Sequence, residues 1–386
     1  MGLKSLSGKN IILITLDGFR KDKIGLSPAL KSIKENSYYF SEMNTNVPYT
    51  FAAHHLIFSG MYPSRNGVDG YYKMFNFKKD EIITLAQLLK ENNYYTVSET
   101  LDESVLPRQG FDEYNLFDEK TANLKKRHAE LIKRLSKKEK FFAFLHFTDT
   151  HLHYVRKIIQ KNGKSGNDDE YYKLKKENND KYEACTPLTD DYIAEIKNAL
   201  DENGLSENTL LIIISDHGTS LGEKYGEKFY GVFVYEDTIN IFCIIHIPDK
   251  SQKIITKQCS TIDLYPTIAE LAGVKIIEKS KIQGISLLDL AENPSAENRP
   301  VFVETGGLYG PWPSPEKHNI FCVKMDGKKL IYNDTPQSWE FYDLKNDPNE
   351  ENNIYEENSK VIANLKKQLI KHLKENNIET KLINFR

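Results

Sequence analysis

Four residues of types that bind metals stand where apolar stretches of the chain end. Asp17, Asp149 and Asp216 each close or closely follow such a stretch, and His217 comes directly after Asp216. A single Asp in that position is usually a turn or helix-cap residue, so each one alone says little. Carboxylates and neutral imidazoles are, however, natural ligands of a borderline divalent cation. Three strand ends that each deliver a carboxylate therefore predict a metal site.

Thr50 is the candidate nucleophile of such a site. It follows Pro48 at the start of a helix-like segment, which places its hydroxyl at a helix N-terminus. Thr is also a common N-cap residue, so the position alone does not imply catalysis. The same geometry supports an anionic oxygen and an anionic substrate. A bound divalent cation would also lower the pKa of the hydroxyl, as it does for bound water.

The elements that position these side chains alternate between strand and helix through the first 300 residues. Unbroken apolar runs of β-branched or aromatic residues predict buried parallel strands, and charged periodic segments predict helices. Strand–helix alternation predicts a three-layer α/β/α fold with a mostly parallel sheet, in which ligands bind at the carboxyl ends of the strands. The predicted strands are 10–17, 141–147 and 210–214, and the predicted helices are 80–92, 120–138 and 188–203.

The pattern changes near residue 300. Short strand-like runs separated by Gly, Pro and Asp predict an antiparallel sheet, and a charged helix over 358–375 closes the chain. We therefore expect a catalytic domain over 1–300 and a small C-terminal α+β subdomain over 301–386. Residues 155–185, rich in Lys, Asn, Asp, Glu and Tyr, form either a solvated insertion or a lid over the site, since they follow Asp149.

Composition excludes several classes of protein. Lys and Arg number 52 and Asp and Glu 55, and a net charge of −3 argues against a nucleic-acid binder. No apolar run reaches the roughly 20 residues that cross a bilayer, and the apolar stretch 11–16 is too short for a secretory leader, so we expect a cytoplasmic protein. The four cysteines show no CxxC spacing and are expected to be reduced core thiols.

The order of these motifs resembles the sulfatase branch of the alkaline phosphatase superfamily. The resemblance implies the alkaline phosphatase-like fold and metal-dependent ester hydrolysis, with Asp17, Thr50, Asp216 and His217 holding one divalent cation. Mixed nitrogen and oxygen ligands favour zinc or manganese, with magnesium or calcium as alternatives. The similar stretches are ITLDGFR (14–20), PYT (48–50) with SGMYP (59–63), FLHFTDTH (144–151), SDHG (215–218) with LGE (221–223), DLYPT (263–267) with LAG (271–273), and KLIY (329–332) with FYDL (341–344).

The chain departs from the sulfatase pattern at the nucleophile. Sulfatases carry a Cys, sometimes a Ser, that is oxidised to formylglycine, whereas Thr50 takes that place here and its oxidation would give a ketone. We therefore expect direct attack by Thr50 on a phosphoester or phosphonoester, in a hydrolase or phosphotransferase. The alternatives are a sulfuric ester hydrolase without formylglycine and a non-catalytic binder of an anionic sugar or lipid headgroup.

The resemblance also assigns residues around the substrate. His54 stands where sulfatases have Arg. Lys224 or Lys228 could neutralise substrate charge in place of a second cation, or could simply lie in an exposed loop. We expect one tightly bound metal and a positively charged second subsite, although His153 could instead complete a second metal site with Asp149. Catalytic roles are predicted for His54, His151 and Lys228, and substrate-binding roles for Asp149, His153 and Lys224.

The substrate is expected to be a small anionic metabolite or glycan that is phosphorylated, phosphonylated or sulfated. Its specificity would come from residues 69–79, from the 155–185 insertion and from 305–318, which includes Trp312. Tyr and Trp side chains in these segments could stack on a sugar or a base, or could be ordinary packing residues.

Overall fold

The computed structural model describes residues 8–162, 169–293, 295–308, 310–313 and 315–384. Within these ranges a nine-stranded sheet crosses the molecule in the order β4–β3–β5–β1–β6–β7–β2–β8, and β9 pairs with β2. All neighbouring strands are parallel except β7, which runs antiparallel to β6 and β2. The strands are β1 (Asn10–Leu16), β2 (Tyr38–Asn44), β3 (Tyr95–Thr100), β4 (Glu113–Leu116), β5 (Phe141–Phe147), β6 (Thr209–Ser215), β7 (Asn240–His246), β8 (Lys253–Ile255) and β9 (Cys259–Ser260).

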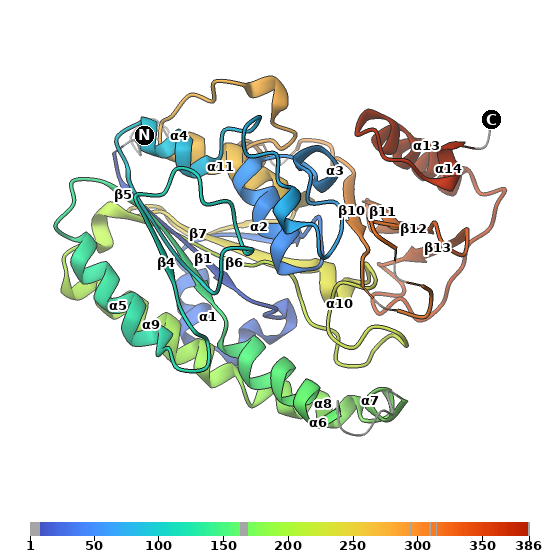
Figure 1. Cartoon of the computed structure of the whole chain (residues 1–386), viewed down its shortest axis with the longest axis horizontal. Coiled ribbons are helices and arrows are strands. Elements are labelled where there is room, and N and C mark those ends of the chain that lie inside the picture. The colour runs from blue at the N-terminus through green and yellow to red at the C-terminus, as the bar shows by residue number, and fades with distance from the viewer. Residues whose placement is uncertain (1–7, 163–168, 294, 309, 314, 385–386) are drawn as a thin grey trace.

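Helices cover both faces of this sheet (Figure 1). Successive side chains of β1 alternate between two cores: Ile11 and Leu13 pack with α2 (Thr50–Ser59), α4 (Leu85–Glu91) and α11 (Leu264–Leu271). Ile12 and Ile14 pack on the other face with α1 (Pro28–Lys34), α5 (Leu124–Leu135) and α9 (Thr186–Glu202). Burial on both faces explains why β1 is an unbroken apolar run. The remaining helices are α3 (Pro63–Asn66), α6 (Lys157–Asn162), α7 (Asp169–Lys173), α8 (Lys175–Glu183), α10 (Glu236–Ile239), α12 (Leu287–Glu292), α13 (Lys360–Glu375) and α14 (Lys381–Asn384).

Two of the predicted helices begin later than their charge patterns suggest, because capping residues fix their first turns. Helix α4 starts after Thr84, whose hydroxyl accepts a hydrogen bond from the backbone amide of Gln87 at 3.1 Å. Helix α5 starts after Asn123, whose side chain accepts from the amide of Lys126 at 3.0 Å. These bonds satisfy backbone donors that have no partner within the helix.

The C-terminal part forms a separate antiparallel sheet with a helix on one face. Its strands are β10 (Val301–Thr305), β11 (Ile320–Met325), β12 (Lys328–Asn333) and β13 (Ser338–Asp343). Helix α13 covers one face of this sheet. The other face packs on Phe233, Val234 and Ile239 of the main part of the chain. An ion pair of Lys329 with Glu236 (3.2 Å) joins the two parts further, and Lys329 also pairs with Glu350 (2.7 Å) within the C-terminal part.

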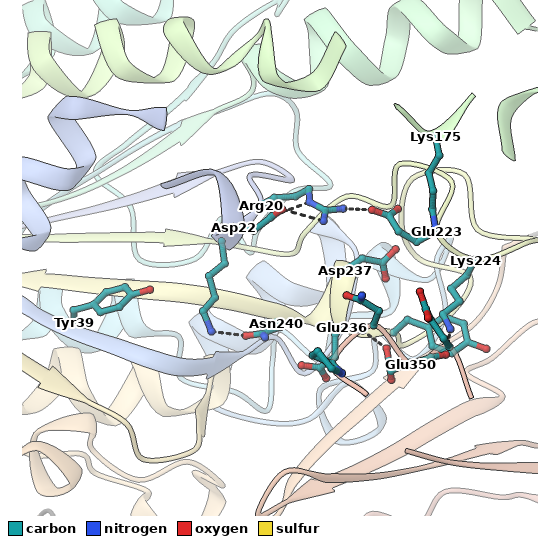
Figure 2. A pocket seen from close by; sticks show the side chains of 15 residues that line it. Arg20, Asp22, Tyr39, Lys175, Glu223, Lys224, Glu236, Asp237, Asn240 and Glu350 are labelled. Carbon is teal, nitrogen blue, oxygen red and sulfur yellow. Dashed lines mark hydrogen bonds and ion pairs between the residues drawn. The ribbon is translucent and has the colours of Figure 1, made fainter. Parts of the chain in front are cut away.

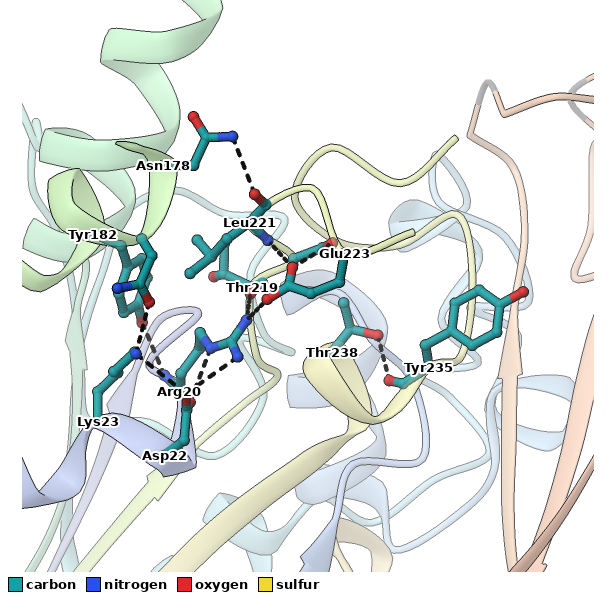
Figure 3. A network of polar contacts seen from close by, with 12 residues as sticks. Arg20, Asp22, Lys23, Asn178, Tyr182, Thr219, Leu221, Glu223, Tyr235 and Thr238 are labelled. Atoms are coloured by element: carbon teal, nitrogen blue, oxygen red, sulfur yellow. Dashed lines mark hydrogen bonds and ion pairs between the residues drawn. The ribbon is translucent and has the colours of Figure 1, made fainter. Parts of the chain in front are cut away.

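The described part of the 155–185 insertion is helical and packed against the strand-end loops, while residues 163–168 lie outside the described residues. The Tyr182 hydroxyl accepts from the Arg20 amide and donates to the Gly18 carbonyl, both at 2.8 Å. The Asn178 side chain donates to the Leu221 carbonyl at 3.1 Å (Figure 3). The insertion is thus fastened to the loops beside Asp17, and lid motion stays a prediction. No helix in the described ranges is long and apolar enough to span a bilayer.

A buried histidine, His372, makes the stability of the folded protein depend on pH. Burial lowers the pKa of His372, which stacks on Phe302, from 6.5 to about 3, so the folded protein keeps this ring neutral. As pH falls below 6.5 the unfolded chain takes up a proton that the folded chain refuses, so stability is lost between pH 6.5 and about 3. At pH 5 this one ring costs about 2 kcal/mol.

The variant His372→Phe keeps an aromatic ring and removes that titration. Urea unfolding at pH 7 and pH 5 is expected to show a loss of stability about 2 kcal/mol smaller in the variant than in the parent chain. An equal loss in both proteins would contradict the assignment.

Candidate active site

Asp17 and Asp216 meet at the edge of the sheet because β1 and β6 are neighbouring parallel strands. Leu16 is in register with Ser215, so the two carboxylates follow their strands at the same level. The Nε2 atom of His217 lies 3.7 Å from a carboxylate oxygen of each aspartate. The ligand atoms of Asp17, Asp216 and His217 all lie within 4.8 Å of one another, and all three residues are buried. Two of the three strand-end carboxylates, those of Asp17 and Asp216, therefore converge as expected.

The turns after the strands fix the orientation of these ligands. Oδ1 of Asp216 accepts hydrogen bonds from the backbone amides of Gly18 (3.1 Å) and His217 (3.0 Å), which leaves Oδ2 free of them. Gly18 has φ +64°, and a Cβ there would lie 2.7 Å from the Thr219 hydroxyl, so the turn requires glycine. Nδ1 of His217 lies 2.8 Å from the Gly218 carbonyl and must donate to it, which leaves Nε2 as the ligand atom.

Thr50 presents its hydroxyl to this cluster from the first residue of α2. Tyr49 is the N-cap, so the capping role considered for Thr50 falls to its neighbour. Thr50 Oγ1 lies 3.2 Å from His217 Nε2. The hydroxyl is thus placed beside the carboxylates at the positive end of a helix.

The electrostatics of the cluster fit a divalent cation. Burial raises the pKa of Asp17, but the neighbouring His146, His151 and His217 outweigh it and hold that pKa well below its usual range. Burial raises the pKa of Asp216, and the charge of Asp17 raises it further. Oδ1 of Asp17 and Oδ2 of Asp216 have no hydrogen-bond partner among the described residues. Buried carboxylate oxygens without partners are costly unless a cation neutralises them.

His151 lies beside the cluster and is oriented by Glu119, which sequence reasoning did not identify. Nδ1 of His151 is 3.4 Å from Glu119 Oε2, and Glu119 also pairs with Arg156. Burial lowers the pKa of His151, but the hydrogen bond to Glu119 and the charge of Asp17 outweigh it, so the pKa is raised. An imidazole whose charged form is favoured is better suited to protonate a leaving group.

Two further histidines reach the cluster, and only one was anticipated. His54 lies one helical turn after Thr50, with Nε2 3.9 Å from Asp216 Oδ2. His146 comes from β5, next to β1, with Nε2 3.3 Å from Asp17 Oδ2. His146 was part of a quoted motif but was given no role. The available signal was a lone imidazole inside an otherwise apolar strand.

The other predicted site residues lie farther from the metal ligands. Burial raises the pKa of Asp149, which faces His153 and Glu119. Neither Asp149 nor His153 belongs to a group of three possible metal ligands within the described ranges, and the second metal site suggested for this pair stays a prediction. Lys224 donates to the backbone carbonyl of Glu350, which lies beside it (Figure 2). Lys224 also lies over the rings of Tyr235 (4.7 Å) and Tyr342 (5.5 Å). Its ammonium group therefore faces the C-terminal subdomain, and a substrate contact by Lys224 stays a prediction.

Lys228 lines a cavity of about 870 Å³ that opens beside the cluster. The cavity is also lined by Tyr230, whose ring centre lies 4.2 Å from that of His217. All three segments predicted to set specificity contribute to its wall, through Tyr72, Tyr172 and Glu316 among others. Trp312 instead packs edge-on against Phe233, so for this residue the packing alternative holds.

Arg20 ties the two ligand-bearing loops together (Figure 3). Its guanidinium group donates to the Thr219 carbonyl (2.9 Å) and to Glu223 (2.8 Å), both beyond His217 in the β6 loop. It also pairs with Asp22 at 2.9 Å. Charge-assisted bonds of this kind hold the loop after Asp17 against the loop after Asp216.

Fold and site together define an alkaline phosphatase-like architecture with a candidate metal site at the ends of its central strands. The chain belongs to the sulfatase family: the family model matches residues 9–274, and the model of the C-terminal region of N-sulphoglucosamine sulphohydrolase matches residues 226–378. The predicted family and fold class are thereby confirmed.

Curated relatives match about half of this chain. An N-acetylglucosamine-6-O-sulfatase of Bacteroides thetaiotaomicron is 31% identical over 212 residues, which cover 52% of this chain and 37% of that protein. Arylsulfatase K of Rattus norvegicus is 29% identical over 197 residues, which cover 49% of this chain and 34% of that protein. The matched segment thus spans about a third of the length of these relatives.

Solved structures show the same fold over nearly the whole chain. One, determined in complex with its substrate D-glucosamine-2-N,6-O-disulfate, aligns with a TM-score of 0.78 and 17% identity over 98% of this chain and 100% of its own. A phosphonate monoester hydrolase from Silicibacter pomeroyi aligns with a TM-score of 0.71 and 13% identity, covering 97% of each chain.

The role of Glu119 can be tested without any substrate. In Glu119→Gln the carboxylate that favours the charged imidazole is lost, so the pKa of His151 is expected to fall. NMR titration of metal-free protein with ¹³C-labelled histidine measures this pKa directly. Glu130→Gln, an exposed change on α5, is the matched control and should leave it unchanged. An unaltered His151 titration in Glu119→Gln would show that Glu119 does not tune this ring.

Proposed function

We propose that this chain hydrolyses esters of a tetrahedral oxyanion at the Asp17–Asp216–His217 cluster, and that a sulfuric ester carried by a sugar is its first candidate substrate. The observation that carries the proposal is the Thr50 hydroxyl, 3.2 Å from His217 Nε2, in a cluster with two buried carboxylates. A large cavity lies next to this cluster, lined by Tyr230, whose ring packs on His217. The sulfatase relatives support the sulfuric ester over the phosphoester expected from the sequence.

Asp17, Asp216, His217 and Thr50 would hold a divalent cation. When bound, the cation supplies positive charge that polarises an ester oxygen and lowers the pKa of a nearby hydroxyl. Imidazole among the ligands favours zinc or manganese, with magnesium or calcium as the alternatives.

The protein's own residues would then carry the group transfer. Thr50 gives its hydroxyl proton to solvent, and Oγ1 attacks the central sulfur or phosphorus atom as the bond to the leaving oxygen breaks, while the protonated His151 gives its proton to that oxygen. Water next attacks the same central atom and passes a proton to His151, which breaks the bond to Oγ1 and releases the oxyanion. Thr50 regains its proton from solvent. Glu119 holds His151 in place and favours its charged form between cycles.

A phosphoester is the second candidate substrate, and the identity of residue 50 favours it. Formylglycine requires the side-chain carbon to become an aldehyde, and the extra methyl group of Thr50 prevents this. A threonine nucleophile must therefore be regenerated by attack of water on the central atom. Phosphate and sulfate esters share size and tetrahedral shape, so the cavity itself does not separate them.

Thr50→Ala is expected to abolish turnover, at least a thousandfold, while the fold and metal content persist, because only the attacking oxygen is removed. The conservative Thr50→Ser should retain activity. The assay compares metal-reconstituted proteins on aryl sulfate, aryl phosphate, phosphodiester and phosphonate monoester substrates, with glucosamine sulfates as sugar esters.

The assay separates the proposals. Sulfate turnover that is lost in Thr50→Ala supports the first candidate, and phosphoryl turnover lost in the same variant supports the second. Substantial activity in Thr50→Ala would exclude Thr50 as the nucleophile. Absence of turnover on every substrate by the metal-loaded parent chain would contradict the hydrolase proposal and favour a binding role.

A further inference from the structure

His54 and His146 form a buried pair of imidazoles beside the proposed metal ligands. Neither side chain is exposed, and their ring centres lie 5.1 Å apart in an edge-to-face arrangement. Both ring nitrogens of His54 and Nδ1 of His146 lack a hydrogen-bond partner among the described residues, while Nε2 of His146 lies 3.3 Å from Asp17 Oδ2. Buried polar atoms in folded proteins are almost always satisfied, so three such nitrogens at one place require an explanation.

The distances suit a cation better than a direct bond. His54 Nε2 lies 3.9 Å from Asp216 Oδ2, which is too far for a hydrogen bond. The ligand atoms of His54, His146 and Asp216 nevertheless lie within 4.8 Å of one another. Ligands about 2.1 Å from a tetrahedral zinc ion are separated by about 3.4 Å, so small side-chain adjustments would close the group around an ion.

Asp216 connects this group to the first cluster. Its Oδ2 atom lies 3.7 Å from His217 Nε2 and 3.9 Å from His54 Nε2, while its Oδ1 atom is occupied by backbone amides. The free oxygen thus faces both sets of ligands. Hydrolases with two metals hold them about 3.5–4 Å apart, and a shared carboxylate oxygen produces such a spacing.

We propose that His54, His146 and Asp216 bind a second divalent transition-metal ion, with zinc as the reference metal, and that Asp216 bridges it to the ion held by Asp17 and His217. The proposal differs from the arrangement that the sequence suggested, which was one metal beside a positively charged subsite. Lys224, a candidate for that subsite, points to the C-terminal subdomain. The second site does not depend on which ester is cleaved, but it shares a ligand with the first.

The test counts metal ions in the full chain. Chelator-stripped protein is dialysed against Zn²⁺ and its content is measured by mass spectrometry, with Co²⁺ absorption spectra reporting the ligands. The parent chain should bind two ions, and His146→Ala one. Asp17→Asn should also keep one, held by the histidine pair. His55→Gln is the matched control, because His55 is buried on the same helix but bonds to the Phe51 carbonyl, and it should bind two.

Single occupancy of the parent chain would overturn the proposal, as would two ions retained in His146→Ala. Loss of all metal in His146→Ala while the variant stays folded would also overturn it, because that outcome indicates one mixed site. Circular dichroism checks the fold of each variant, and His146→Gln keeps the side-chain volume if the alanine variant does not fold. Mn²⁺ spin coupling in the electron paramagnetic resonance spectrum checks the short distance independently and should vanish in His146→Gln.

Discussion

The burial of Asp17 and Asp216 side by side is the constraint on which the rest of the structure depends. Two carboxylates at the ends of neighbouring strands repel each other and lose most of their hydration. Three surrounding imidazoles and the backbone amides of the β6 turn offset part of this cost, but two oxygens remain without partners. A cation completes the arrangement, so the metal site follows from the electrostatics of the sheet edge.

The surrounding elements hold that edge in place. Arg20 binds the loops after β1 and β6 to each other, and Tyr182 of the insertion bridges the backbone at Gly18 and Arg20. Helix α2 brings Thr50 and His54 to the same cluster one turn apart, so the proposed nucleophile and a proposed metal ligand are positioned by a single element. The C-terminal sheet supports the cavity wall from the other side through its core with Phe233. The insertion, α2 and the C-terminal part thus all help to position the residues and loops at the strand ends.

Much of the fold and part of the site could be predicted from the sequence, because parallel strands that are buried on both faces appear as unbroken apolar runs. The apolar runs located β1, β5 and β6, and their closing residues located Asp17, Asp216 and His217. Glu119 could not be found, because it reaches His151 from a loop 32 positions earlier and no spacing rule joins the two. The orientation of Lys224 could not be predicted, because a motif does not reveal which way a loop turns, and its ammonium group faces the C-terminal subdomain. His146 was overlooked because a histidine within an apolar strand usually signals packing.

A crystal structure of the metal-loaded chain with vanadate tests the central claim most directly. Vanadate mimics the five-coordinate centre of group transfer and reveals the attacking atom. The account predicts vanadate in line with Thr50 Oγ1, and an anomalous metal peak about 2.0–2.2 Å from Asp17, Asp216 and His217. A metal bound elsewhere, or a Thr50 hydroxyl turned away from the vanadate, would contradict it.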